Sequence, residues 1–228
     1  MAEVFKSVIG RLTGALGNMV FRNRGSVTTV SMRPKSFLAG TDIKAQNRRA
    51  RFGLTGMFAA AVNKDASLKR FWDLATPPNM SAANGIFKAN YKHITPDDVT
   101  DLARLTPGIS VKVSAVSSSM TNVLVSATLD VIGTDQKIDL LVEKKIQMVA
   151  VIYCKSPLNE DEAKNHFICL KSGKVVLNLT TELAFTIPLM SDETQYFDIY
   201  SSQKCFYTFV TLDDDDVPYH FTNTLLIP

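Results

Sequence analysis

Two different spacings of hydrophobic residues divide the chain near its middle. From residue 42 to 94, apolar residues recur every three or four positions among charged ones, which predicts helices over 42–64, 65–75 and 81–94. From residue 109 on, short β-branched and aromatic runs alternate with Gly, Pro, Ser, Asn and Asp, which predicts antiparallel strands. These runs lie at 109–117, 121–132, 138–154, 166–171, 174–179, 183–189, 195–201, 205–212 and 221–227. Their spacing is typical of an immunoglobulin-like β-sandwich, and only 158–165 reads as a helical turn inside it.

A third pattern comes before both of these. Residues 17–37, GNMVFRNRGSVTTVSMRPKSF, contain two short β-rich runs separated by Asn23, Arg24 and Gly25, which predicts a β-hairpin. A two-stranded ribbon is barely stable in water by itself. We therefore expect the hairpin to lean on a sheet, on a helix or on another molecule.

The segment TPDDVTDLARLTPG, residues 95–108, separates the two halves. Thr95 or Asp97 is a candidate cap for a short helix that runs to Leu105 before a Pro-Gly pair ends it. The predicted fold class is α+β, with an N-terminal β-hairpin and three or four helices followed by the antiparallel sandwich. The predicted domains are a hairpin-plus-helices module over 1–94, a linker over 95–108 and a sandwich domain over 109–228.

Charge follows the same division. Residues 1–94 carry 15 Lys and Arg against 4 Asp and Glu, whereas residues 95–228 carry 10 against 18. The net charge of +3 therefore hides a basic half and an acidic half. The basic residues that gather on the hairpin and on the helix after it are Arg22, Arg24, Arg33, Lys35, Lys44, Arg48, Arg49 and Arg51.

Three interpretations of this basic region stay open. It docks on the acidic half of another copy, which is a head-to-tail contact that closes into a ring or continues as a fibre. It binds nucleic acid phosphates, although no DNA- or RNA-reading motif accompanies it and Phe37 and Phe52 look like core residues. Or the two halves of one chain neutralise each other. In a docking hairpin, the side chains that supply buried apolar area are Val20, Phe21, Val27 and Val30.

Candidate catalytic and metal-binding residues are weak. Gly10, Gly14 and Gly17 lack the Gly-Lys-Ser/Thr of a phosphate loop, so we interpret them as turn residues. The set His166, Cys169 and Cys154 lacks the tight pair spacing of a zinc site, and the run 213–216 lacks the pattern of an EF-hand and reads as a solvated turn of a terminal hairpin. We expect no enzyme activity, no metal or other cofactor, no small-molecule substrate and no membrane contact.

The remaining composition fits an ordinary globular protein. Hydrophobic residues make up 46% of the chain and charged residues 21%, and no apolar run approaches the ~20 residues needed to cross a bilayer. The first residues do not read as a secretory signal. Three widely spaced cysteines favour buried thiols in a reducing compartment over a disulfide framework.

Four stretches of the chain form a recognisable set: GRLTGALGNMVFRNRGSVTTVSMRP, AQNRRARF, SAANGIFKANY and CFYTFVTLDDD. They resemble an uncharacterised family of proteins from Bacteroidota and their phages, and the resemblance leads to the expectation of a crAss-like phage protein. The middle of the second half matches nothing in that family. The matching positions are Gly14, Gly17, Asn18, Val20, Arg33, Pro34, Gln46, Arg49, Phe52, Phe87 and Asn90.

The resemblance implies a lineage and no catalytic residues. It leads to the expectation of a structural virion protein, such as a neck or tail ring subunit, made in the host cytoplasm and carried in the particle. The expected partners are further copies of the chain in a ring and other virion proteins, with nucleic acid as the alternative.

Overall fold

The computed structural model describes residues 2–4, 13–24, 27–33 and 40–227. The chain divides into two compact units: residues 1–46 with 77–79, and residues 47–76 with 80–228. The predicted division put all the helices with the hairpin. In the structure the helices belong to the unit of the large sheets, because they share a core with one of those sheets.

The first unit contains a four-stranded antiparallel sheet, which includes the predicted hairpin. The hairpin strands are β3 (Met19–Arg24) and β4 (Val27–Met32), and its turn at 25–26 lies outside the described residues. Two short flanking strands, β1 (Ala2–Val4) and β2 (Gly14–Leu16), were not predicted, and they give the order β1-β4-β3-β2. Gly17 has a φ of +57° in the tight connection from β2 to β3, so its interpretation as a turn residue is confirmed.

Three predicted helices are present, and local capping explains where they begin. Helix α1 spans Ile43–Lys64 and crosses from the first unit into the second, and the Asp42 carboxylate accepts the amide of Ala45 at 2.8 Å at its start. Helix α2 (Ala66–Ala75) begins at Asp65, whose carboxylate accepts the amide of Leu68 at 2.7 Å. Helix α3 (Ala82–Asn90) begins at Ser81 and runs into the 3-10 turn η1 (Tyr91–His93).

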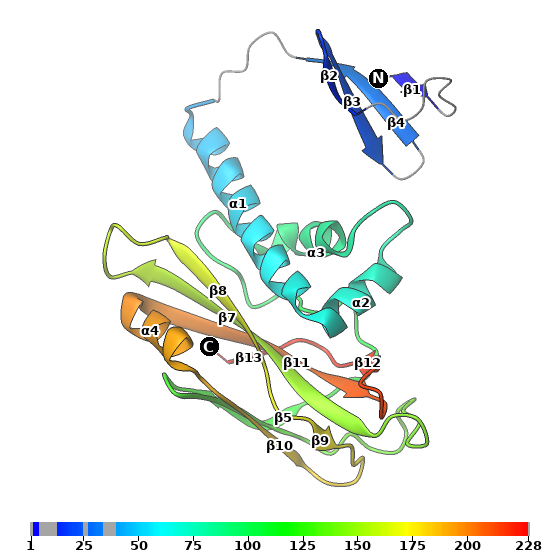
Figure 1. Ribbon diagram of the computed structural model, residues 1–228. Coiled ribbons are helices and arrows are strands. Elements are labelled where there is room, and N and C mark those ends of the chain that lie inside the picture. Colours follow the sequence, from blue (N-terminus) through cyan, green and yellow to red (C-terminus); the bar gives the residue numbers. More distant parts are fainter. Residues whose placement is uncertain (1, 5–12, 25–26, 34–39, 228) are drawn as a thin grey trace. The chain divides into compact units, whose positions relative to one another are not determined.

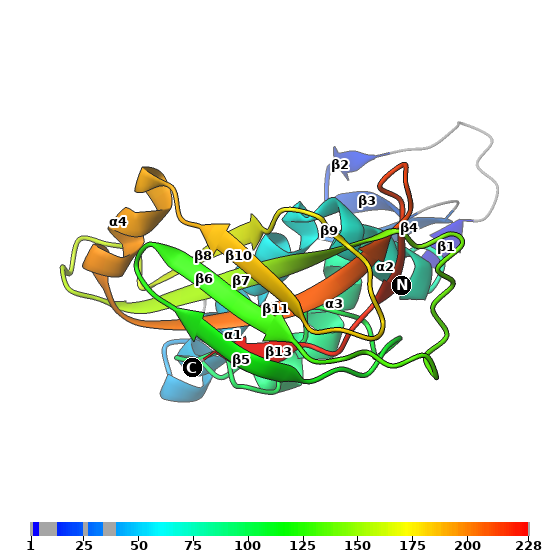
Figure 2. The same cartoon turned by 90° about the horizontal axis from the view of Figure 1, so that it is seen from below.

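The second unit is built on a central antiparallel sheet with the order β12-β11-β7-β8. Its strands are β7 (Lys145–Pro157), β8 (Asn165–Lys171), β11 (Tyr200–Leu212) and β12 (Pro218–Phe221), with β9 (Val175–Val176) on β7 and β13 (Leu225–Ile227) on β11. A second sheet, β10-β6-β5, contains β5 (Ala115–Met120), β6 (Leu124–Leu129) and β10 (Leu183–Pro188). Figure 1 shows helices α1 to α3 on one side of the central sheet, and Figure 2 shows the smaller sheet over the other side.

Alternation along β7 and β11 separates two hydrophobic cores. On β7, Met148, Ala150 and Ile152 face the smaller sheet, whereas Val149 and Val151 face the helices. Successive side chains of a strand point to opposite faces, so a strand buried on both faces reads as one continuous apolar run. The unit is therefore α+β with three layers: helices, the central sheet and the small sheet.

Aromatic pairs join these layers. Phe58 of α1 lies edge-on to Phe167 of β8 and to Phe206 of β11, each at 5.9 Å between ring centroids. Between the two sheets, Phe185 and Phe209 meet at 4.8 Å. Phe58 has none of its surface exposed, so the helix layer is part of the core.

Three predicted elements are wrong. The predicted helix in the linker segment 95–108 is replaced by turns and a short bridge between Ile94 and Val99, and the helical turn predicted over 158–165 is replaced by turns over 158–164 and the start of β8. The predicted strand 195–201 is mostly helix α4 (Ser191–Ile199). Glu193 accounts for it, because its carboxylate accepts the amide of Met190 at 2.7 Å and caps the helix start.

Candidate functional site

The N-terminal sheet has an apolar row at one end of one face. Leu16 pairs with Met19, and Met19 pairs with Met32, so the three side chains lie side by side on one face. Their exposed fractions are 64%, 40% and 70%, although all three are large and hydrophobic. The next pair on this face, Phe21 and Val30, is half-buried. This face is the clearest candidate docking surface in the first unit.

The predicted apolar set is split between the two faces of this sheet. Phe21 and Val30 lie on the apolar face, whereas Val20 lies opposite Ser31 and shares the other face with Arg22 and Val27. The grouping by composition left out Leu16, Met19 and Met32. Period-2 alternation reaches Met19 from Phe21 and Met32 from Val30, whereas Leu16 lies in β2, which no pattern predicted.

The basic residues of the predicted hairpin differ in position and exposure. Arg22 is exposed opposite Thr29, and exposed Arg33 follows β4 with its backbone amide bonded to Asn18 at 2.6 Å. Arg24 ends β3, and Lys35 lies outside the described residues. The sheet thus carries exposed positive charge at Arg22 and Arg33.

Helix α1 presents only part of its predicted basic stripe to solvent. Lys44, Arg48 and Arg49 are exposed, whereas Arg51 is half-buried. Both Nε, at 2.8 Å, and Nη2 of Arg51 donate to the backbone oxygen of Tyr91, and its guanidinium lies 4.3 Å from the centre of the Tyr91 ring. Arg51 therefore joins α1 to η1 and is occupied inside the unit.

An aromatic row lies beside this arginine. Phe52 meets Phe87 at 4.8 Å, and Phe87 stacks on Tyr91 at 5.6 Å. Phe52 was predicted to be a core residue, but 62% of its surface is exposed. The prediction was wrong because Phe52 lies on the flank of α1 next to Phe87 of α3, whereas Phe58 and Val62 of the same helix are buried in the core shared with the central sheet.

An ionic cluster joins the segment 95–108, which was predicted to be a linker, to the central sheet. Asp98 accepts Lys155 of β7 at 2.9 Å and Lys204 of β11 at 3.1 Å, and Lys204 also reaches Asp101 at 3.1 Å. Burial works to raise the pKa of Asp98, but the hydrogen bonds from both lysines outweigh it and hold that pKa below its ordinary value. The same contacts raise the pKa of Lys204 against the opposing effect of burial. This cluster fixes the segment in place.

The arrangement in the second unit that most resembles an enzyme site is centred on a buried glutamate. Glu143 is 1% exposed, and its carboxylate accepts the Thr211 hydroxyl and lies 3.0 Å from Nδ1 of His220. A hydrolytic triad needs a nucleophile on the second nitrogen of the histidine. Here the hydroxyl of Thr211 donates to the carboxylate instead. The geometry is therefore that of a structural brace.

The cysteines and histidines do not form a metal site in the described part of the chain. No group of three or more His, Cys, Asp or Glu residues there has the geometry to hold a metal ion. Burial raises the pKa of Cys154 and Cys205 to about 12 and that of Cys169 to about 11, and all three are free. His166, opposite Cys154 in the sheet, stacks on Tyr196 of α4 at 3.9 Å. These thiols are structural.

Two open cavities lie in the second unit. One, of about 450 Å³, lies between α1 and the end of β7, where Leu54, Met57 and Pro157 meet Lys155 and Lys164. The other, of about 380 Å³, is lined by 101–104, Thr106 and the last strand connection. Neither contains a constellation of catalytic groups among the described residues.

Comparisons with known proteins add no assignment. No family profile, curated protein or solved structure matches this chain. Among the described residues, no helix is both long enough and apolar enough to cross a bilayer.

Proposed function

We propose that this chain is a non-enzymatic structural subunit of a tailed-phage particle, a neck or tail ring protein that binds its neighbours through the N-terminal sheet. The observation that carries the proposal is the exposed row of Leu16, Met19 and Met32 on one face of that sheet. The virion setting itself rests on the family resemblance of the N-terminal stretches.

The energetics favour apolar contact over charge. Full burial of a side chain such as Leu or Met contributes roughly 1.5–3 kcal/mol. An exposed ion pair contributes a median of about 0–1 kcal/mol, so Arg22 and Arg33 would orient the contact more than stabilise it. An exposed row of three large apolar side chains on so small a sheet therefore supports docking on another protein.

The sheet edge offers a second contact. Among the described strands, β2 pairs only with β3, so one side of Gly14–Leu16 keeps unpaired backbone groups. A strand from a neighbouring subunit that adds to this edge would satisfy them. Edge addition would place that strand next to Leu16, at the end of the apolar row.

The second unit serves as the body of the proposed subunit. We keep an immunoglobulin-like topology for its two sheets as part of the proposal, supported by short antiparallel strands packed face to face around a shared core. The helices cover one face of the larger sheet and the smaller sheet covers the other, so the smaller sheet is the second outer layer. Such a protein would be made in the host cytoplasm and carried in the virion.

A single charge placed in the apolar row tests the proposal. Met32→Asp is preferable to a change at Phe21, because Phe21 is half-buried whereas Met32 is 70% exposed, so we expect its substitution to leave the sheet intact. The matched control is Leu74→Asp on α2, where the leucine is 76% exposed. We expect wild type and control to assemble by mass photometry and sedimentation, and Met32→Asp to be monomeric. A solitary wild-type chain, or an assembled Met32→Asp variant, would refute the docking role.

One observation favours nucleic acid as a second candidate. The exposed ring of Phe52 lies on the same helix as exposed Arg48, and an aromatic ring beside a cation is a stacking platform for single-stranded bases. Gel shifts with single-stranded and duplex DNA test this candidate. Nanomolar to micromolar binding by a monomer, reduced at least tenfold in Phe52→Ala, would support it over assembly, and oligomers that form without DNA would support assembly.

A further inference from the structure

The outer strand of the central sheet, β8, has an open edge. Among the described strands β8 pairs only with β7, and no other backbone hydrogen bond between described residues reaches it. Figure 1 shows β8 at the border of the sheet. Phe167 and Ile168 keep 7% and 8% of their surface exposed, whereas the residues of β7 over 148–154 are 0% exposed. An unpaired edge of this kind is a template for another strand.

The hydrogen bonds of the sheet show which residues of β8 direct their backbone groups outward. The amide of Ser172, which continues the β7–β8 register, donates to the backbone oxygen of Met148 at 2.9 Å. In an antiparallel ladder the backbone groups of successive residues point to opposite edges, so the even-numbered positions of β8 bond to β7. Phe167 and Cys169 therefore direct their N–H and C=O groups away from the sheet. The backbone at these positions is available to a partner strand.

The edge of β8 lacks the features that usually protect an edge strand. Its seven residues contain no proline, no bulge interrupts their register with β7, and their one lysine, Lys171, stands at the end. Natural edge strands commonly carry charges, prolines or bulges that prevent pairing with other chains. A straight apolar edge without them indicates a pairing surface.

Both faces of β8 are buried, which restricts the kind of strand that fits beside it. Ile168 and Leu170 belong to the core between the two sheets, whereas Phe167 and Cys169 pack in the core shared with the helices. A strand added at this edge must therefore be apolar on both faces as well. The edge strands β2, β5, β10 and β12 each have exposed residues on at least one face. A second copy of β8 meets the requirement.

We propose that two copies of the protein pair through β8 in an antiparallel register centred on Ile168. Phe167 of one copy then lies opposite Cys169 of the other. Asn165 lies opposite Lys171 in the same way, so the outward backbone groups at these positions gain partners. The twofold axis of this pair is perpendicular to the sheet, so the helices of both copies lie on one side of it. The central sheet thus continues from one copy into the other.

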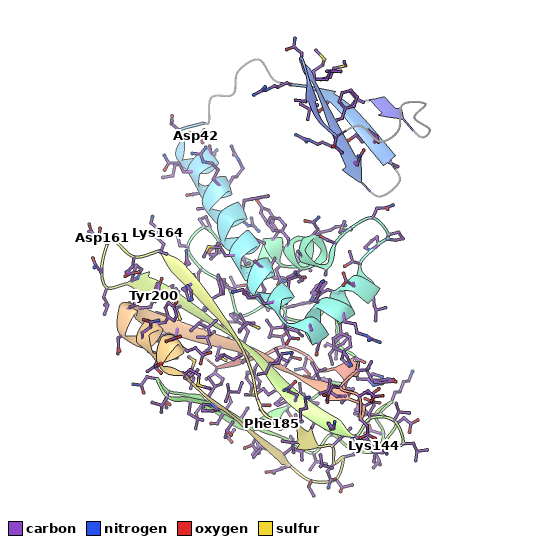
Figure 3. The ribbon with its side chains drawn as sticks, viewed as in Figure 1. Asp42, Lys144, Asp161, Lys164, Phe185 and Tyr200 are labelled. Atoms are coloured by element: carbon purple, nitrogen blue, oxygen red, sulfur yellow. The ribbon has the colours of Figure 1, made fainter. Side chains whose placement is uncertain are left out.

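The charged residues at the ends of β8 do not decide the pairing. Lys171 already pairs with Asp65 at 2.6 Å within one copy. The turn before β8 contains acidic residues over 160–162 and the basic Lys164, and Figure 3 labels Asp161 and Lys164 there. Each end thus has both positive and negative groups nearby, and exposed ion pairs contribute little. The contact depends on backbone hydrogen bonds and on apolar packing.

A contact made by one strand from each copy is weak. The strand is about 24 Å long at roughly 3.4 Å per residue, and its pairing buries less than the ~1,000 Å² that marks a stable interface. The β8 dimer is therefore dissociated under the dilute conditions that test the N-terminal sheet, and it forms at protein concentrations of about 0.1–1 mM. In an assembly held by the N-terminal sheet, the higher local concentration favours it.

Proline at an outward-facing position tests the pairing. Cys169→Pro removes an amide that points away from β7, so the monomer keeps its ladder, whereas a partner strand loses a hydrogen bond and meets the proline ring. Cys169→Ser keeps the amide and is the matched control. Both changes are made in the full-length Met32→Asp chain, so that the N-terminal sheet does not contribute. We expect sedimentation equilibrium at about 1 mM to show dimers of the control, and association at least roughly tenfold weaker for Cys169→Pro.

Cross-linking tests the register and decides the question if the proline variant does not fold. Ala163 and Gly173 are exposed just outside the two ends of β8. In the proposed register Ala163 of one copy lies near Gly173 of the other, whereas the same residue in the two copies is about 34 Å apart at roughly 3.4 Å per residue. We expect a short bismaleimide to join a mixture of Ala163→Cys and Gly173→Cys chains, and to join neither variant alone. The native thiols have raised pKa values and give a low background.

The outcomes separate this contact from the docking role of the N-terminal sheet. A Met32→Asp chain that stays monomeric at about 1 mM would overturn the β8 contact, as would equal association of folded Cys169→Pro and Cys169→Ser. Equal cross-linking of the mixture and of either variant alone would also overturn it. Species larger than a dimer would indicate that β8 pairs with a different edge, which contradicts the proposal. The inference goes beyond the proposed function, because β8 belongs to the second unit and each test works without the N-terminal sheet.

Discussion

Phe58→Ala tests whether the helices and the sheets fold as one unit. Phe58 is fully buried and lies 5.9 Å from both Phe167 and Phe206, so its removal opens a cavity where α1 meets two strands. Phe-to-Ala changes in a core cost about 3–5 kcal/mol of unfolding free energy. In a protein of this size each kcal/mol lowers Tm by roughly 2–4 °C, so the expected decrease is about 6–20 °C.

Two spectroscopic probes show which layers of the protein the substitution destabilises. The single tryptophan, Trp72, lies in α2 with its indole nitrogen bonded to the Leu105 backbone oxygen at 2.8 Å, so its fluorescence reports the helix layer. Far-ultraviolet circular dichroism reports the sheets as well. We expect both urea transitions to coincide in wild type and to shift together in Phe58→Ala.

The matched control is Phe52→Ala on the same helix. Phe52 is 62% exposed and contacts Phe87, so its loss should change stability by at most about 1 kcal/mol. The reasoning would be refuted if Phe58→Ala cost no more than this control. It would also be refuted if fluorescence and circular dichroism gave separate transitions, as the predicted division into a helical module and a sandwich requires.

Three further predictions concern one buried asparagine and two half-buried ionisable residues. Asn90→Ala should lower the unfolding free energy by about 2–4 kcal/mol in urea titrations, because the Asn90 amide both donates to and accepts from the Arg104 backbone at 3.0 and 2.7 Å, while exposed Asn84→Ala should change little. The pKa of Asp98 in the folded state is below its ordinary 3.8. The stability that its ionised carboxylate contributes is therefore fully present above pH 3.8 and is lost as the pH falls through the folded pKa. Asp98→Asn should flatten this acidic part of a plot of thermal stability against pH. Burial, with a smaller effect of a nearby lysine, lowers the pKa of His166 from 6.5, so stability should fall as pH drops below 6.5. Burial also lowers the pKa of His93, so a pH series of unfolding midpoints on His166→Phe should show a smaller slope than wild type.

The elements were largely predictable, but their partners were not. The run of apolar residues in β7 predicted a strand, and a run without alternation is typical of a strand buried on both faces. Nothing in the run says that helices cover one face and a sheet covers the other. The boundary was therefore placed at the change of period near residue 95, although Phe58 and Val151 belong to one core.

Two errors can each be traced to the contacts of a single side chain. The segment 95–108 contains helix-compatible residues between prolines, but Asp98 is drawn to Lys155 and Lys204 of the sheet, and that tertiary contact fixes a turn. In 191–199 the aromatic residues favoured a strand, whereas the cap from Glu193 decides for a helix. Propensity yields in both places to contacts made by a single side chain.

The structure changes which residues of the predicted docking region are exposed. Charge drew attention to the hairpin and α1, but Arg51 is occupied by Tyr91 and the exposed apolar row begins at Leu16, in a strand that no pattern predicted. The turn Leu140–Val142 was read as part of a longer strand. Exposure is a property of the folded chain, and an apolar run looks the same in a core and on a surface.

The order in which the chain is synthesised gives the three-layer arrangement a further consequence. Helices α1 to α3 emerge from the ribosome first, yet the strands that cover their apolar faces end at Pro157 and Leu212. Until β11 has been made, the apolar face of each helix has no complete sheet to pack against. Although the helices are made before these strands, they should become protease-resistant on a nascent chain only together with the central sheet, and aggregation is the main risk until then.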